Sequence, residues 1–173
     1  ELDILDDAWK NPHMHILSLV AWGGVGKSAL VNGWLNRLAQ NHYAGARRVY
    51  GWSFYSQGSK EDGQASADTF LDETLKWFGE TNTTRYANAW DKGIRLAELV
   101  GQEPTLLILD GLEPLQYPAG PMHGQLKDQG LQALLKQLAV FEQLLVPIAH
   151  AEPHGLLFEG FPVLGIQSDH GIH

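Results

Sequence analysis

The sequence of 173 residues contains no cysteine, an absence that excludes disulfide scaffolds and thiolate metal sites. No apolar run approaches the roughly 18 residues that cross a membrane, and the acidic first residues lack the basic segment of a signal peptide. We therefore expect a cytoplasmic protein that has no membrane partner.

Positive charge is also scarce. The chain has 12 Lys and Arg against 20 Asp and Glu, so its net charge is -8. A field of this sign repels nucleic acid, and we expect no nucleic-acid partner. Any bound phosphate must then be held by local groups. With 44% hydrophobic and 18% charged residues, the composition is that of a globular protein, and the length fits one domain with a core.

The hydrophobic pattern predicts helices that alternate with strands. Short apolar runs that end at glycine or aspartate are typical of buried parallel strands, and apolar residues at spacings of three and four indicate helices. We expect strands over residues 15–20, 47–55 and 105–109, and helices over residues 28–40, 65–78, 88–100 and 131–145. Alternation of this kind predicts the α/β class, with a mostly parallel sheet covered on both faces.

A glycine-rich segment joins the first expected strand to the first expected helix. Residues 21–28 read Ala-Trp-Gly-Gly-Val-Gly-Lys-Ser and match the phosphate-loop pattern G-x-x-x-x-G-K-[ST], except that Ala21 replaces the first glycine. Backbone N–H groups that curl around phosphate oxygens need residues without Cβ atoms, and the helix that follows adds its positive end. We expect a nucleotide to be bound by Gly23, Gly24, Val25, Gly26, Lys27, Ser28 and Ala29.

A carboxylate follows the third expected strand. The apolar run 106–109 ends at Asp110, which places this side chain at the same sheet edge as the glycine-rich segment. Lys27 is expected at the β- and γ-phosphates, while Ser28 and Asp110 are expected to hold Mg²⁺. Glu113 is the candidate base that orients the attacking water. Lys27, Asp110 and Glu113 are therefore the catalytic candidates.

These segments resemble the STAND class of P-loop NTPases, which includes the NACHT and NB-ARC families. The resemblance covers residues 1–140 and depends on residues 23–28, on residues 49–57 and on Leu-Ile-Leu-Asp-Gly-Leu-Glu at 107–113. It implies a P-loop NTPase with a three-layer α/β/α fold that binds ATP or ADP with Mg²⁺. It also implies a nucleotide-dependent switch with slow hydrolysis at best, whose partners are other domains or protomers of a signalling ATPase.

The last part of the chain departs from that family. No Arg follows Arg95, so the arginine that the family uses as a sensor is missing. Residues 144–149 are apolar enough for a strand, but Pro147 lacks the N–H that a central strand uses. We expect an NTPase core over residues 1–145, incomplete at its end, and an atypical, poorly ordered tail over residues 146–173, produced by a frameshift or a truncation.

Two other functions remain open from the sequence. A non-catalytic fragment with weak or no nucleotide binding follows if the central strand and the sensor arginine are both missing. A small-molecule kinase would need cations in a closing lid, and only Lys127 and Lys136 follow Asp110. The aromatic side chains of Trp52, Phe54 and Tyr55 are expected in the core of a strand rather than as a stacking surface for nucleic acid.

Overall fold

The computed structural model describes residues 1–20, 25–57, 67–118, 120–122, 124–140, 144–150 and 163–165, with backbone alone for 56–57, 144–150 and 163–165. Its sheet has five strands in the order β2-β3-β4-β1-β5, and every neighbouring pair is parallel. The strands are β1 (Ile16–Val20), β2 (Arg48–Ser53), β3 (Thr105–Asp110), β4 (Leu144–His150) and β5 (Val163–Gly165).

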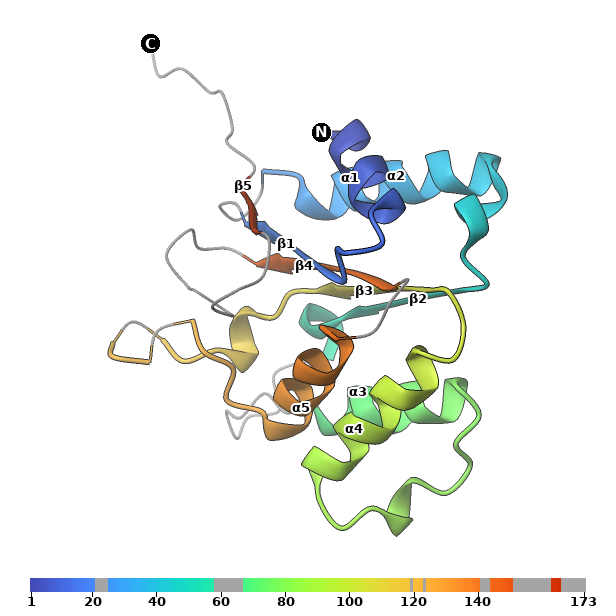
Figure 1. Ribbon diagram of the computed structural model, residues 1–173. Helices are drawn as coiled ribbons and strands as arrows, with labels where there is room; N and C mark the ends of the chain where they lie inside the picture. The colour runs from blue at the N-terminus through green and yellow to red at the C-terminus, as the bar shows by residue number, and fades with distance from the viewer. Residues whose placement is uncertain are drawn as a thin grey trace.

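Helices cover both faces of this sheet, as Figure 1 shows. One face carries α1 (Leu2–Lys10) and α2 (Lys27–Gln40), and the other carries α3 (Asp68–Trp77), α4 (Ala89–Val100) and α5 (Gln129–Leu138). Short 3₁₀ turns join these elements: η1 (His42–Gly45), η2 (Phe54–Gln57), η3 (Thr83–Arg85) and η4 (Glu113–Leu115). The expected three-layer α/β/α architecture with a parallel sheet is confirmed.

Strand β3 shows how the sequence fills both faces. Leu106 and Ile108 point into the core beneath α1 and α2, whereas Leu107 and Leu109 point into the core beneath α3, α4 and α5. Successive side chains of a strand face opposite sides, so a strand between two helical layers must be apolar throughout. Each buried leucine contributes about 1.5–3 kcal/mol relative to an exposed one.

Strand β4 lies in the centre of the sheet, between β3 and β1. The expectation that Pro147 excludes a central strand is therefore wrong. The pairing with β1 is continuous and sets Pro147 beside Leu17, whereas the pairing with β3 passes from Leu145 to Ile148 without a pair at Val146 or Pro147. The register on both sides of this gap is the same, so the proline interrupts one ladder locally and leaves the strand in place.

Several boundaries differ from those expected, most of all at helix α5. Helix α5 ends at Leu138 instead of residue 145, because Leu145 pairs with Leu106 as part of β4. Its start is fixed by Asp128, whose carboxylate accepts a hydrogen bond from the Leu131 N–H at 2.9 Å. Strand β4 also crosses the boundary expected at residue 145, and the division into core and tail stays a prediction.

Helix α1 was not expected from the sequence. It buries Leu5 and Ala8 and is fastened to α2 by polar contacts. The Trp34 indole N–H donates to Asp6 at 2.8 Å, and the Arg37 guanidinium lies 2.9 Å from Asp6. A short helix of this kind gains its stability from packing against a partner rather than from its own sequence.

Helices α4 and α5 approach each other at two glycines. A Cβ atom at Gly93 would collide with the carbonyl group of Gly130, and a Cβ atom at Gly130 would lie 2.6 Å from the Ala89 carbonyl oxygen. The contact between the two helix backbones therefore requires glycine at both positions.

Substitution of Gly93 tests this contact. We expect Gly93→Ala to lower the free energy of unfolding by about 1–3 kcal/mol, because the added methyl group overpacks the helix contact. Gly33→Ala is the matched control, since Gly33 lies inside helix α2 with no atom within 4 Å of an added Cβ. This control should raise stability by up to about 1 kcal/mol. Urea unfolding measures both, and equal effects of the two substitutions would contradict the prediction.

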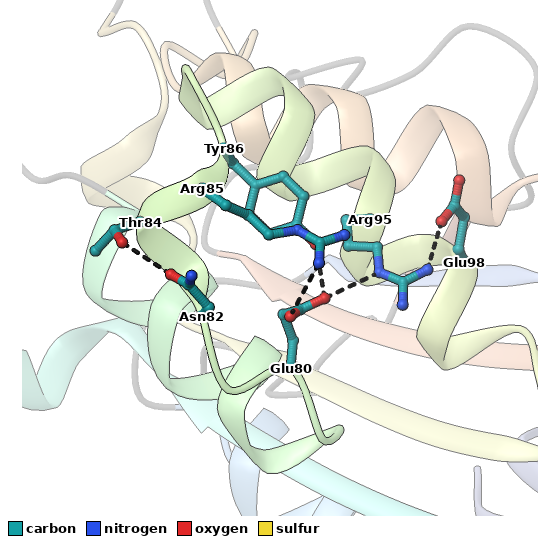
Figure 2. A network of polar contacts seen from close by, with 7 residues as sticks. All are labelled: Glu80, Asn82, Thr84, Arg85, Tyr86, Arg95 and Glu98. Carbon is teal, nitrogen blue, oxygen red and sulfur yellow. Dashed lines mark hydrogen bonds and ion pairs between the residues drawn. The ribbon is translucent and has the colours of Figure 1, made fainter.

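Glu80, which follows α3 and is buried, is the centre of a polar network whose other members are half-buried or exposed (Figure 2). Its carboxylate accepts a hydrogen bond from the Tyr86 hydroxyl at 2.7 Å and lies 3.3 Å from Arg95 of α4. The Tyr86 hydrogen bond, followed by the Arg95 hydrogen bond and the charge of Arg85, outweighs burial and lowers the pKa of Glu80. The charged form of Glu80 is thus the one that ties the α3–α4 connection to α4.

A lowered pKa makes this tie sensitive to acid. The stabilisation is fully present above the ordinary carboxyl pKa of about 4.3 and is lost as the pH falls through the lower folded pKa. We expect Glu80→Gln to be less stable than the parent at pH 7, with the difference shrinking below about pH 4. Urea unfolding across this pH range measures it. Glu73→Gln, at a 58% exposed side chain, is the control and should show a small difference at every pH.

Candidate functional site

The start of helix α2 presents backbone donors toward the sheet edge where β1 ends. Gly26 precedes the helix with φ +92°, a left-handed conformation that favours glycine, and its carbonyl accepts the Leu30 N–H at 2.8 Å. Gly26 has no side chain to cap the helix, and the first turn holds no acidic residue. The N–H groups of this turn and the positive end of the helix can therefore receive an anion.

Two expected site residues meet at this edge. The Ser28 hydroxyl donates a hydrogen bond of 2.9 Å to the Asp110 carboxylate, across 82 positions of sequence. Ser28 belongs to the first turn of α2, and Asp110 is the last residue of β3. Ser28 is exposed and Asp110 is half-buried, so a ligand can reach both side chains.

Glu113 lies at the start of η4, three residues beyond Asp110. Both of its carboxylate oxygens are buried and make no hydrogen bond of ordinary geometry within the described part of the chain. A carboxylate that is removed from water without donors carries a large desolvation cost. Glu113 therefore stays a candidate site residue, and its carboxylate oxygens lie in a covered position.

Tyr55 completes the arrangement and was not expected there. Its ring packs against Gly111, which has φ +76° and no space for a Cβ atom beneath the ring. The pKa of Tyr55 is raised by partial removal from solvent, and then by the neighbouring carboxylates of Glu113 and Asp110. The side chain is 59% exposed, so the expectation that Tyr55 belongs to a strand core is wrong. The strand ends at Ser53, and η2 carries Tyr55 over the sheet edge.

The other expected residues divide into two groups. Val25, Lys27 and Ala29 lie at or beside the first turn of α2, while Gly23 and Gly24 lie outside the described residues.

The sequence held one signal that could have placed Tyr55 near the site. Tyr55 comes just after β2, whose carboxyl end lies on the same sheet edge as Asp110. Parallel strands bring their carboxyl ends to one edge, so residues that follow each strand are candidates for a shared site.

The described residues form neither a metal-binding cluster nor a membrane-spanning helix. Across the residues that the structure describes, no group of three or more His, Asp or Glu side chains is arranged to hold a metal ion. Within the same ranges, none of the helices has the length and apolar character needed to cross a membrane.

Comparison with known proteins identifies a fold rather than a family. No protein-family model matches the chain, and no curated protein does. The solved structure of C. elegans PCH-2 aligns with 96% of this chain at 15% identity and a TM-score of 0.50. A chain of the E. coli MS115-1 HORMA:CdnC:Trip13 complex aligns with 94% at 16% identity and a TM-score of 0.46. The genome packaging NTPase B204 of Sulfolobus turreted icosahedral virus 2, in complex with ATP-gammaS, aligns with 84% at 17% identity and a TM-score of 0.40.

The chain spans only part of these proteins: 41% of PCH-2, 51% of the E. coli chain and 68% of the viral NTPase. At this identity, the likeness to PCH-2 shows the fold alone. The fold class expected from the sequence, three α/β/α layers with a parallel sheet, is confirmed.

The packing of the Tyr55 ring against Gly111 leads to a prediction for this glycine. We expect Gly111→Ala to destabilise the fold by about 2–4 kcal/mol, because it adds strain at positive φ and displaces the ring. Gly79→Ala is the control, since Gly79 has φ +99° but no atom within 4 Å of an added Cβ. Thermal unfolding should show a smaller loss for this control. The excess cost of Gly111→Ala should also disappear when Tyr55 is replaced by alanine, and its persistence there would contradict the prediction.

Proposed function

We propose that this chain is the nucleotide-binding domain of an ATPase and that it binds ATP or ADP with Mg²⁺. The observation that carries the proposal is the 2.9 Å hydrogen bond from Ser28 to Asp110. It joins the first turn of the helix after the glycine-rich segment to the acidic end of β3. A hydroxyl and a carboxylate at these two places are the pair that a phosphate-loop enzyme needs for its metal ion.

The phosphates would be held by Gly26, Lys27 and the first N–H groups of α2. Lys27 begins the helix, and its ammonium group supplies a mobile point charge on the anionic side of the ligand. Gly23 and Gly24 are proposed to contribute further backbone donors. This local set of donors explains how a chain with a net charge of -8 binds a polyanion.

The donor set at Ser28 and Asp110 fits Mg²⁺. This ion prefers hard oxygen ligands and is usually bound through one or two protein groups, with waters and phosphate oxygens in the other positions. When bound, it neutralises charge on the phosphates. On binding the ion, Asp110 would give up its hydrogen bond with Ser28 and coordinate Mg²⁺ instead.

Glu113 is proposed as the base that accepts a proton from the attacking water. It is covered in this structure and has to become accessible before water can reach it. The covered base supports slow hydrolysis at best. We propose with it a cycle in which the bound ATP or ADP sets the state of the domain.

The finer proposal is a STAND-type switch that acts in signalling, with other domains or protomers of a signalling ATPase as its partners. Its support is the resemblance of residues 23–28 and 107–113 to that class. The alternative of a non-catalytic fragment had rested on a missing central strand and a missing sensor arginine. Strand β4 removes the first reason, and only the second remains.

Nucleotide binding is tested by thermal unfolding with and without MgATP or MgADP. Binding to the folded state should stabilise the chain by about 2.7 kcal/mol at a hundredfold excess over the dissociation constant. We expect Lys27→Ala to abolish this shift. Lys76→Ala, on helix α3 with its side chain 56% exposed, is the matched control and should keep it. A parent chain whose midpoint does not respond to nucleotide would overturn the proposal.

The metal role is separated from phosphate binding by a second variant. Asp110→Ala removes the carboxylate expected on Mg²⁺ and should remove the part of the nucleotide shift that depends on Mg²⁺. The shift measured in EDTA should remain or increase, because a negative charge near the phosphates has gone. If the shift in EDTA were lost as well, Asp110 would be needed for the structure of the phosphate loop and not for binding the metal ion.

A further inference from the structure

A pocket of about 340 Å³ opens at the edge of the sheet opposite the candidate site. Its walls come from three separate segments: the end of α1 with the turn that follows it, the η1 turn, and Pro104. Met14 and Pro104 come just before β1 and β3, whereas Asp110 ends β3. In a parallel sheet these positions lie at opposite ends of the strands. The volume is within the range of pockets that bind small molecules.

Hydrogen bonds between segments far apart in the sequence hold the walls together. The Trp9 indole N–H donates to the Ala44 carbonyl oxygen at 3.1 Å, across 35 positions. The Pro104 carbonyl oxygen accepts the N–H groups of Arg47 and Arg48 at 2.8 and 3.3 Å. Because its only polar atom is engaged, Trp9 contributes an apolar ring to the lining.

The η1 turn has an unusual backbone conformation where it forms one of these walls. Three consecutive residues with side chains, His42, Tyr43 and Ala44, have φ of +46°, +54° and +49°. A left-handed conformation is costly for a residue with a Cβ atom, and it persists where the surrounding structure enforces it. Because backbone strain of this kind is concentrated at functional sites and ligand clamps, it supports a function for the pocket.

Most of the lining is apolar. The apolar walls are formed by Trp9, Pro12, Met14, Ala44 and Pro104. An indole ring beside prolines and a thioether favours a flat, apolar ligand, because such surfaces pack closely against an aromatic ring.

The polar part of the lining offers donors. Lys10 is exposed, and its ammonium group forms no ion pair with any residue that the structure describes. The Asn11 side-chain oxygen already accepts the His13 N–H at 3.0 Å, so the amide NH₂ group is what Asn11 has left for a ligand. None of the described lining residues is acidic. The nearby Glu103 is paired with Arg48 at 3.4 Å.

We propose that this pocket binds a small aromatic carboxylate, with its ring against Trp9 and its carboxylate on Lys10 and Asn11. The apolar walls suit the ring, and an ammonium group beside an amide NH₂ group suits an anionic acceptor. The inference goes beyond the proposed nucleotide-binding function and does not depend on it, because the two sites lie at opposite edges of the sheet.

The binding test compares cinnamate with cinnamamide, a neutral ligand of nearly the same shape. We expect cinnamate to bind the parent chain more tightly than cinnamamide in a calorimetric titration. Lys10→Met keeps most of the apolar stem and should weaken cinnamate binding by about tenfold, because it removes a charge-assisted hydrogen bond. The affinity for cinnamamide should not change. Since Lys10 is exposed, the variant should fold like the parent.

Lys76→Met is the matched control. Lys76 lies in the last turn of α3, as Lys10 does in α1, and its side chain is 56% exposed. This variant should bind cinnamate as the parent does. Three results would each overturn the proposal: no cinnamate binding at millimolar concentration, equal affinities for the two ligands, or an affinity for cinnamate that Lys10→Met leaves unchanged.

A second measurement locates the ligand. In a ¹H–¹⁵N spectrum, the indole N–H resonance missing from Trp9→Phe belongs to Trp9, and Trp77→Phe identifies that of Trp77 in the same way. Cinnamate should shift the Trp9 resonance and leave that of Trp77, which is 51% exposed on α3, in place. A shift of Trp77 without one of Trp9 would mean adsorption to an exposed aromatic surface and would refute the pocket.

Thermal unfolding with MgATP is read separately. If nucleotide gives no thermal shift but cinnamate binds through Lys10, the nucleotide site fails and this pocket stands. If nucleotide binds through Lys27 and cinnamate does not bind, the pocket is overturned while the nucleotide-binding function is retained.

Discussion

Ser28 and Asp110 lie 2.9 Å apart, although the strands that precede them, β1 and β3, are not neighbours in the sheet. Strand β4 separates them, and at about 4.8 Å between adjacent strands the two are roughly 10 Å apart. The contact is possible because α2 starts over the sheet edge and brings Ser28 across this gap. Every element of the candidate site therefore depends on β4 occupying the centre of the sheet.

The layer on the other face holds the carboxyl ends of β2 and β3 in place. Helices α4 and α5 are in backbone contact at Gly93 and Gly130, and the leucines of α5 pack against β3 from below. Asp128 caps α5 and also accepts a hydrogen bond from the Ala67 N–H at 3.2 Å, which ties the start of α3 to the same point. Rigid packing of this kind fixes the turn after β3 where Gly111 and Glu113 lie.

Charge at the site is arranged in two parts. The positive end of α2, with Lys27 as its first residue, lies on one side, while Asp110 ends β3 and Glu113 begins η4 on the other. Asp110 is half-buried and accepts a hydrogen bond from Ser28, whereas both carboxylate oxygens of Glu113 are buried. Two carboxylates three residues apart thus lie in different surroundings, and the proposed function assigns them different roles: Asp110 would bind the cation, and Glu113 would act as the base.

The sequence by itself determined the elements whose signal is local. The apolar runs of β1 and β3 and the glycine-rich start of α2 follow from residue types within a few positions. Only the tertiary structure decided three features: Pro147 in a central strand, Leu145 in β4 rather than in a helix, and Tyr55 over Gly111. Each depends on a neighbour far away in the sequence. At each position, the free energy gained from burial or from a contact with that neighbour outweighs the secondary-structure propensity of the residue. The hydrophobic periodicity of the sequence does not reveal which distant residue the neighbour is.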